Sequence, residues 1–229
     1  MRGPLRRLYW ALRPGKNRRM FDYDRRLLVN EYLAEQEAGT HDLESAIART
    51  GFSLGYPAWN LLYYSLLCSL PRSGQPLPVV VETGTNRGFS TIVLAQALHD
   101  AGAGTVVRTV DSDPDVVKLA EQNVARAGVA ELVRFSVSDS LEFLRALPRE
   151  VDRVDFALLD GAHDAEHVLA EFELVQHLVR SCGGKVYFDN TSAGGVAEAL
   201  RKVRAAHGGN LIEFENCSWA PPGNAIWQP

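Results

Sequence analysis

Strand-like and helix-like segments alternate regularly after residue 78, and this alternation constrains the fold more than any other feature of the chain. Short apolar runs predict strands near residues 79–83, 106–111, 132–137, 154–160 and 185–189. The segments between and after them predict helices near residues 88–101, 114–127, 140–147, 163–180 and 194–207. This order is typical of a doubly wound parallel sheet with helices on both faces.

Two more strand-like runs, residues 210–216 and 224–228, lie near the end of the chain. The few residues that join them are too short a connection for a helical crossover, so we expect these two strands to be antiparallel. The prediction is therefore an α/β fold with a doubly wound, Rossmann-like sheet of seven strands, the last pair antiparallel.

A segment rich in Pro, Gly and Ser, residues 71–78, separates this sheet from a helical region before it. We expect residues 1–76 to form a helical N-terminal extension and residues 77–229 to form the α/β domain. The run from Trp59 to Leu70 is apolar on nearly every side, which favours packing in the core or at a dimer contact over lining a substrate site. The extension is therefore expected to act as a substrate cap or as the contact of a homo-oligomer.

The net charge of −4 argues against general binding of polyanions such as nucleic acid. Arginine and lysine nevertheless crowd the first 26 residues, and this basic segment could contact nucleic acid or a membrane surface; a solvated terminus is the simpler interpretation. The 3 cysteines have no paired spacing, which indicates reduced thiols. Because no apolar run is long enough to span a bilayer, we expect a cytoplasmic protein without a membrane span.

Acidic residues stand at or just after the ends of the predicted parallel strands: Glu82, Asp111, Asp139, Asp160 and Asp189. In an open parallel sheet, ligands bind outside the carboxyl ends of the strands, so these side chains are expected to converge on one site. Carboxylates that crowd together resist ionisation unless positive charge is supplied. The pattern therefore predicts a site for a cationic ligand, and for a metal ion as well.

The turn after the first predicted strand carries the signal for a cofactor. Gly84 and Gly88 allow a sharp turn and a close approach of the backbone to a ligand. Asn86 stands where the dinucleotide pattern needs its second glycine, which disfavours a nicotinamide cofactor. Glu82 would repel a pyrophosphate but attract an ammonium or sulfonium group, and Asp111 is placed to bind ribose hydroxyls. S-adenosylmethionine is the cofactor that fits these features.

Short segments in this half of the chain resemble the motifs of one enzyme family. Residues 82–90, Glu-Thr-Gly-Thr-Asn-Arg-Gly-Phe-Ser, resemble the first motif of class I methyltransferases. The version is typical of catechol and caffeoyl-CoA O-methyltransferases and of related bacterial enzymes, including those that methylate antibiotic sugars. Residues 110–114 resemble the second motif and residues 138–140 the third, while residues 159–164 and 188–190 resemble two metal-binding segments. The resemblance covers nearly all of the chain after the linker, in the right order.

This resemblance implies a role for each matching residue. Gly84 and Ser90 would hold the methionine end of S-adenosylmethionine, Asp111 the ribose, and Asp139 with Ser140 the adenine. The complete set expected to bind the cofactor is Glu82, Gly84, Thr85, Asn86, Gly88, Ser90, Asp111, Ser112, Asp139, Ser140 and Asp160.

The resemblance also implies that Asp160, Asp189 and Asn190 ligate a divalent ion. Oxygen donors of this kind suit Mg²⁺, and they are compatible with another divalent cation. Such an ion makes a hydroxyl beside it easier to deprotonate. The alternative is that these residues cap strand ends or helices, because Asp-Asn after an apolar strand is also ordinary turn chemistry.

His163 follows Asp160 by three positions, where relatives of this type carry a lysine or a histidine. A histidine can take the proton of an acceptor hydroxyl, so His163 and Asp160 are the predicted catalytic residues. The alternatives for His163 are a metal ligand or an exposed residue at a helix N-terminus. Other histidines of the predicted helices, among them His167, are expected at the helix surface.

Together these features predict an enzyme that transfers a methyl group from S-adenosylmethionine to a hydroxyl of a small molecule, a sugar or phenolic natural product, with help from a divalent ion. The main alternative is a metal-independent methyltransferase that acts on nitrogen or RNA. A nicotinamide-dependent oxidoreductase and a binding domain without catalytic activity also stay open, since fold does not determine function.

Overall fold

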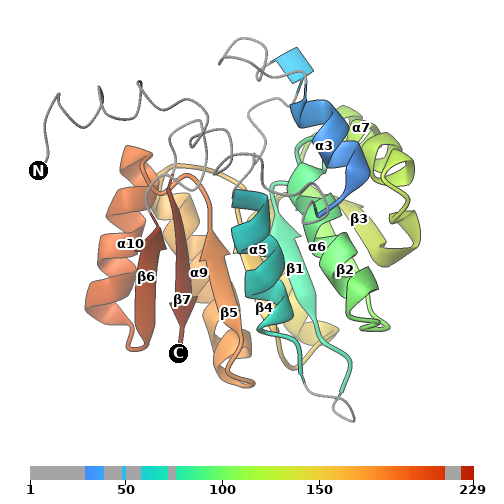
Figure 1. Ribbon diagram of the computed structural model, residues 1–229. Helices are drawn as coiled ribbons and strands as arrows, with labels where there is room; N and C mark the ends of the chain where they lie inside the picture. The colour runs from blue at the N-terminus through green and yellow to red at the C-terminus, as the bar shows by residue number, and fades with distance from the viewer. Residues whose placement is uncertain (1–28, 39–47, 50–57, 72–75, 215–222) are drawn as a thin grey trace, which may run out of the picture.

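The computed structural model describes residues 29–38, 48–49, 58–71, 76–214 and 223–229. A central sheet runs through it, and Figure 1 shows the carboxyl ends of its parallel strands at the top. The strands are β1 (Val80–Thr83), β2 (Val107–Asp111), β3 (Val133–Val137), β4 (Phe156–Leu159), β5 (Lys185–Phe188), β6 (Asn210–Phe214) and β7 (Asn224–Gln228). Each of them coincides with a predicted strand, with small differences at the ends.

The strand order is β3-β2-β1-β4-β5-β7-β6 in a 7-stranded sheet. Neighbours from β3 to β5 are parallel, whereas β7 is antiparallel to both β5 and β6. The predicted fold class, including the antiparallel last pair, is thus confirmed. The sequence did not predict that β7 inserts between β5 and β6. This insertion pairs Phe188 with Ala225 and places the start of β7 beside the end of β5.

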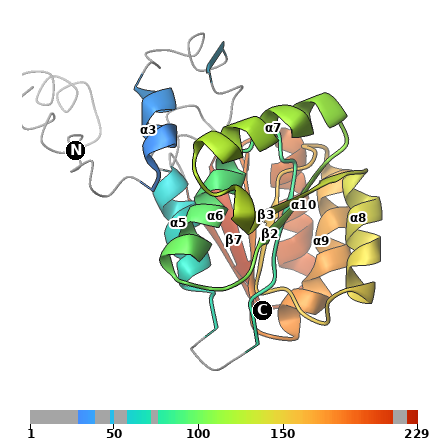
Figure 2. The same ribbon diagram turned by 90° about the vertical axis from the view of Figure 1, so that its right-hand side faces the viewer.

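Helices cover both faces of the sheet, and Figure 2 shows α5 and α6 on one side with α8, α9 and α10 on the other. The helices are α3 (Glu31–Glu37), α5 (Ala58–Leu67), α6 (Phe89–Asp100), α7 (Pro114–Arg126), α8 (Ser140–Ala146), α9 (Ala165–Arg180) and α10 (Gly194–Ala206), with 3₁₀ turns at Ala130–Leu132 and Leu147–Arg149. In β4, Phe156 and Leu158 join the hydrophobic cluster that contains α6, while Ala157 and Leu159 join the cluster that contains α9. Burial on both faces is expected for a central strand of a parallel sheet.

Aspartates start the helices that follow β2, β3 and β4. Asp113, Asp139 and Asp164 each accept hydrogen bonds from backbone N–H groups in the first turn of α7, α8 and α9, respectively. Such caps satisfy donors that the helix itself leaves without a partner. The loops at the carboxyl edge of the sheet are therefore held by their own acidic residues.

The described part of the N-terminal region packs into the same core as the sheet. Trp59, Leu62 and Leu66 of α5 are buried in one cluster with residues of α6 and β1, and Leu33 of α3 belongs to this cluster too. Tyr64, on the outer side of α5, is exposed. The division of the chain near residue 76 and the role of the extension stay predictions. The basic segment of the first 26 residues lies outside the described residues.

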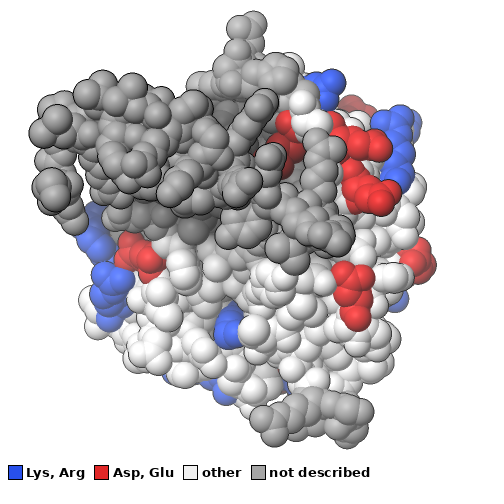
Figure 3. All heavy atoms as spheres, in the orientation of Figure 1, with Lys and Arg blue, Asp and Glu red and all other residues white. Residues whose placement is uncertain are grey.

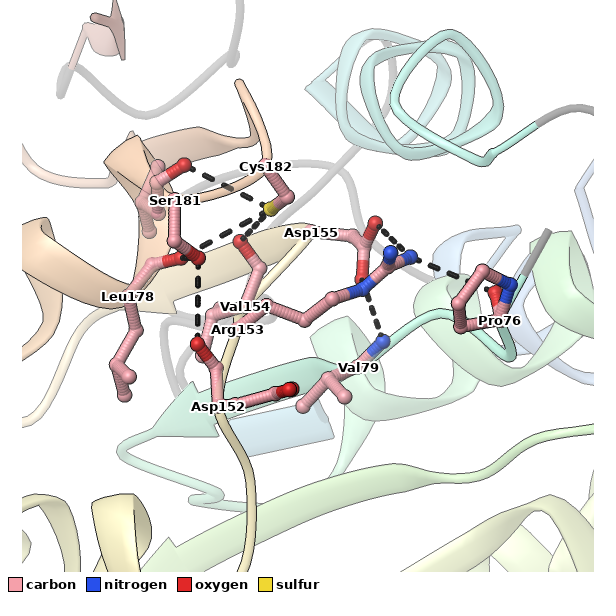
Figure 4. A network of polar contacts seen from close by, with 10 residues as sticks. Pro76, Val79, Asp152, Arg153, Val154, Asp155, Leu178, Ser181 and Cys182 are labelled. Atoms are coloured by element: carbon pink, nitrogen blue, oxygen red, sulfur yellow. Dashed lines mark hydrogen bonds and ion pairs between the residues drawn. The ribbon is translucent and has the colours of Figure 1, made fainter.

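A polar network ties together the amino-terminal edge of the sheet (Figure 4). The buried carboxylate of Asp155 accepts hydrogen bonds from the backbone N–H of Val79 at 2.8 Å and from Arg153 Nη2 at 2.7 Å. Arg153 also donates to the carbonyl oxygen of Pro76 at 3.4 Å. The network fixes the start of β1 to the start of β4. It therefore lies at one edge of the sheet, and the acidic strand ends lie at the opposite edge.

No helix among the described residues combines the length and apolar character needed to cross a membrane. Cys68 and Cys182 are free thiols, and Cys217 lies outside the described residues. The free thiols of Cys68 and Cys182 are consistent with the reduced state expected for the cysteines. A cytoplasmic location stays a prediction.

Candidate active site

Acidic side chains line the carboxyl edge of four neighbouring strands. Asp111 ends β2, Glu82 lies near the end of β1, and Asp160 and Asp189 directly follow β4 and β5. Since the strand order in this region is β2-β1-β4-β5, these residues occupy successive positions along the edge. The chain reverses its direction of winding between β1 and β4, which is where ligands bind in open α/β sheets. Asp139 lies further out, beyond the end of β3.

A very close backbone contact joins the loop after β1 to the loop after β4. Gly84 has a φ of +78°, and a Cβ atom added there would lie 2.0 Å from the carbonyl oxygen of Asp160. Only glycine fits, because that oxygen belongs to the backbone and cannot move aside as a side chain can. Gly88, with a φ of +79°, packs less tightly against α7, where an added Cβ atom would lie 3.1 Å from Cβ of Ala120. We call residues 83–88 the glycine loop; its glycines set its backbone against Asp160 and against α7.

Asp111 holds the glycine loop from the side of β2. Its carboxylate accepts hydrogen bonds from the backbone N–H groups of Asn86 at 2.9 Å and of Asp113 at 3.1 Å. The side chain of Thr85 is buried, whereas Ser112 is exposed. Among the residues expected at the cofactor, Asp111 and Asn86 are thus joined directly, and the side chain of Thr85 points into the protein.

Glu82 is the more deeply buried of the two buried acids of the site. Its side chain has no exposed surface, and Oε2 accepts a hydrogen bond from Thr91 Oγ1 at 2.5 Å. Oε1 has no hydrogen-bond partner within the described part of the chain. Burial raises the pKa of Glu82 to about 7, although nearby hydroxyl groups, that of Ser90 first, oppose this rise. A buried carboxylate next to the glycine loop fits a positively charged group of a ligand, such as an ammonium.

Asp160 joins two of the residues predicted to act with it. Asn190 Nδ2 donates a hydrogen bond to Asp160 Oδ1 at 3.0 Å, and His163 Nε2 lies 3.1 Å from the same oxygen. His163 is about half exposed. The hydrogen bond with Asp160 raises the pKa of His163 above its ordinary value, and burial acts in the opposite direction. The structure thus places a titratable imidazole beside the carboxylate at the end of β4.

Asp189 completes this group of residues from the end of β5. Its side chain is buried, and burial, followed by the negative charge of Asp160, raises the pKa of Asp189 to about 8. The charge of Asp160 thus makes ionisation of Asp189 less favourable. A cation between them would stabilise both charges.

Asn224 is a part of the site that sequence reasoning missed. It is the first residue of β7, it is fully buried, and its Nδ2 donates a hydrogen bond to Asp189 Oδ1. The antiparallel pairing of β5 with β7 creates this contact, because it sets the residues after Phe188 beside the start of β7. A buried amide in this position holds the Asp189 carboxylate in one orientation. No local pattern signals Asn224, since its role depends on where β7 enters the sheet.

The residues expected to hold a metal ion do meet in space. They are two carboxylates and one amide, and the described residues contain no group of three or more His, Cys, Asp or Glu side chains that could hold a metal ion. The donors nevertheless suit a hard divalent ion, because Asp160 and Asp189 supply negative charge and a rotated Asn190 amide could present its oxygen to an ion beside Asp160. Their chemistry therefore fits the ion that the resemblance implies.

Asp139 and Ser140 stand at the start of α8. Asp139 is exposed and caps the helix, while Ser140 Oγ lies 2.8 Å from His167 Nε2. His167, expected at the helix surface, is 24% exposed, and its ring faces the buried Glu171. The packing of α9 against α8 turns this histidine inward, toward the residues predicted to bind adenine.

Comparison with known proteins finds methyltransferases among the proteins that this chain resembles. Residues 81–191 match the protein family described as Methyltransferase domain. A rhamnosyl O-methyltransferase from Mycobacterium tuberculosis is 30% identical over 139 residues, which are 60% of this chain and 52% of that protein. The transmembrane O-methyltransferase from Homo sapiens is 30% identical over 131 residues, which are 55% of this chain and 43% of that protein. The chain therefore spans about half the length of the curated relatives it matches.

Solved structures share the fold over most of the chain. The O-methyltransferase from Bacillus cereus, in complex with SAH, has a TM-score of 0.68 at 19% identity, and the match covers 90% of this chain and 95% of that one. TomG from Streptomyces achromogenes, in complex with SAM, has a TM-score of 0.66 at 22% identity, covering 90% and 93%. Residues 81–191, which match the methyltransferase-domain family, hold every predicted site residue, in agreement with the resemblance to methyltransferases.

Replacement of Glu82 by glutamine is expected to change how stability depends on pH. Because the pKa of Glu82 is raised from 4.5 to about 7, the folded state binds this proton more tightly than the unfolded state does. The free energy of unfolding therefore falls as the pH rises between these two values, by roughly 3 kcal/mol for this group. Chemical denaturation of the wild type should give a lower free energy of unfolding at mildly alkaline pH than at acidic pH. In Glu82→Gln, the part of this difference that comes from Glu82 should be missing.

Glu121→Gln, on the exposed side of α7, is the matched control and should keep the pH dependence of the wild type. If Glu82→Gln and the wild type lost the same stability over this pH range, Glu82 would not be the buried, proton-binding group described above.

Proposed function

We propose that this chain transfers a methyl group from S-adenosylmethionine to a hydroxyl of a small molecule, assisted by a divalent ion. The observation that carries the proposal is the contact of Gly84 with the backbone of Asp160. It sets the glycine loop and the buried Glu82 beside the pair of Asp160 and His163. A cofactor held on the glycine loop would therefore lie next to a residue that can take a proton.

The residues around the glycine loop would each bind one part of the cofactor. Glu82 has a carboxylate oxygen without a partner in the described part of the chain, and this oxygen suits the ammonium group of the methionine end. Asp111 stands where an acid binds ribose hydroxyls, and Ser140 with Asp139 would bind adenine. The SAH and SAM in the two similar structures support the same cofactor here.

Proton removal is the step that the chain's own residues would perform. S-adenosylmethionine would supply an electrophilic methyl group, and a divalent ion held by Asp160, Asp189 and Asn190 would make the acceptor hydroxyl easier to deprotonate. His163 then takes the proton, and Asp160 orients its imidazole through the 3.1 Å contact. Alignment of the acceptor oxygen with the methyl group accounts for most of the acceleration, since orientation can contribute roughly 7–11 kcal/mol.

The proposed acceptor is a sugar or a phenolic natural product. Two similar proteins support this class, because one is described as a rhamnosyl O-methyltransferase and the other as involved in tomaymycin synthesis.

On the face drawn in Figure 3, the described Lys and Arg side chains are scattered, and α3 carries Glu31, Glu35 and Glu37 without a basic residue. The described residues on this face give no support for RNA as the acceptor.

Asp111→Ala is expected to weaken cofactor binding. S-adenosylmethionine and S-adenosylhomocysteine should raise the melting temperature of the wild type, whereas NAD should not. The variant should lose most of this shift, because it lacks the carboxylate that holds both Asn86 and the ribose. Asp115→Ala removes the same charge from the exposed first turn of α7 and should keep the shift. An unchanged shift in Asp111→Ala would place the ribose elsewhere.

Removal of the divalent ion is expected to abolish turnover. A chelator should stop methyl transfer and added Mg²⁺ should restore it, as measured with labelled S-adenosylmethionine and a panel of sugar and phenolic acceptors. Asp189→Ala and the size-matched Asp189→Asn should lose activity and still bind S-adenosylhomocysteine, because Asp189 lies on the ion side of the site. Full activity in excess chelator would instead support the metal-independent alternative.

His163→Ala is expected to lower the turnover rate by about 10²-fold near neutral pH, the range usual for loss of a general base. Cofactor affinity should stay nearly intact, and activity should partly recover as the pH rises and the acceptor ionises by itself. His177→Ala, at the exposed end of α9, is the control and should keep full activity. Complete rescue of His163→Ala by millimolar Mg²⁺ would make His163 a metal ligand and not the base.

A further inference from the structure

Glu171 is a buried carboxylate that neither the fold nor the proposed reaction requires. It lies on α9 between Val168 and Phe172, within the apolar stripe that packs against the sheet. Its side chain has no exposed surface, and neither carboxylate oxygen has a hydrogen-bond partner among the described residues. Burial of such a group destabilises a fold, so an apolar residue would serve packing better.

The Glu171 carboxylate faces residues from two further segments of the chain. Its Oε1 lies 3.5 Å from Nε2 of His167, one turn earlier on α9. A Cβ atom added to Gly161 would lie 2.4 Å from Glu171 Oε1 and 3.3 Å from Ser140 Oγ. Ser140 Oγ is in turn 2.8 Å from His167 Nε2. Glu171, His167 and Ser140 therefore form one polar cluster against the backbone of Gly161.

This cluster contacts two parts of the proposed cofactor site. The peptide that joins Asp160 to Gly161 packs against Gly84 on one side, and Gly161 packs against Glu171 on the other. Ser140 belongs both to the cluster and to the residues expected to bind adenine. The Asp160–Gly161 peptide, against which Gly84 packs, and Ser140, expected at the adenine end, are thus both in contact with this cluster.

We propose that Glu171 and His167 are positioning residues for the adenine end of the cofactor, acting through the hydroxyl of Ser140 and the backbone of Gly161. This inference rests on the proposed function. The negative charge of Glu171 favours the protonated imidazole of His167, which donates a hydrogen bond from Nε2 to Ser140 Oγ. The hydroxyl then keeps its own proton for an acceptor on the ligand, such as a ring nitrogen of adenine.

The electrostatic surroundings of His167 agree with this assignment. Its pKa is raised, first by the interaction with Glu171, and burial opposes the rise. Asp164, which caps α9, and Asp139, which caps α8, add to the rise. The acidic groups that face the imidazole from both helices therefore favour its protonated, donating form.

Cofactor affinity and stability should change in opposite directions when Glu171 is made apolar. Isothermal titration with S-adenosylhomocysteine should show roughly three- to tenfold weaker binding for Glu171→Gln, Glu171→Leu and His167→Gln, the loss expected for one misdirected hydrogen bond. The melting temperature of Glu171→Leu should be equal to or above that of the wild type, because a buried carboxyl group without a hydrogen-bond partner among the described residues is gone. A merely structural carboxylate would not produce this combination.

A double-mutant cycle tests whether the effect passes through Ser140. Ser140→Ala should weaken binding by itself, and Glu171→Gln added to it should change the affinity little further, because coupled residues are not additive. Glu173→Gln is the matched control: Glu173 lies on the same helix, is exposed, and pairs with His207 at 2.8 Å. This control should keep the affinity of the wild type.

Unchanged affinity in folded Glu171→Gln and His167→Gln would overturn the inference, and so would additive losses in the cycle with Ser140→Ala. If the wild type itself did not bind S-adenosylhomocysteine, the proposed function would fail first, and the inference with it. The two failures are therefore distinguishable in one set of titrations.

Discussion

The close packing of Gly84 against the peptide of Asp160 is the contact on which the rest of the site depends. It joins the loops after β1 and β4, the two strands between which the chain reverses its direction of winding. On one side of this contact lie Glu82 and Asp111, which suit a cationic nucleoside. On the other side lies Asp160 with His163, which suit an ion and a proton transfer. A side chain at position 84 would separate these two halves.

A surplus of negative charge at this edge gives the site its chemistry. Glu82 has a pKa of about 7 and Asp189 a pKa of about 8, so both carboxyl groups bind protons more tightly than exposed ones do. Groups whose ionisation is made unfavourable in this way destabilise the fold and cluster at functional sites. A cationic cofactor and a divalent ion would supply the missing positive charge. The site is therefore built at some cost in stability, and its ligands should recover part of that cost.

The sequence predicted the parallel strands, the helices between them and the acids at the strand ends, because hydrophobic periodicity and turn residues are local signals. It also placed Asp160, His163 and Asn190 together, as the hydrogen bonds now show. It did not predict Asn224, whose contact with Asp189 depends on the insertion of β7 beside β5. Nor did it predict the inward position of His167, which depends on how α9 packs against α8. Long-range pairing of strands and helices leaves no local signal, and this explains the misses. The roles assigned to the site residues stay predictions.

Titration of Gly84→Ala with S-adenosylhomocysteine tests the central claim most directly. Gly128→Ala is a suitable control, because Gly128 has a nearly equal φ of +76° but no atom within 4 Å of an added Cβ. Both variants should carry the strain of a left-handed alanine, which costs about 1 kcal/mol. Only Gly84→Ala should lose at least about tenfold in affinity, corresponding to 1.4 kcal/mol or more, because its methyl group meets the backbone of Asp160. A folded Gly84→Ala variant that bound S-adenosylhomocysteine as tightly as the wild type would contradict the account.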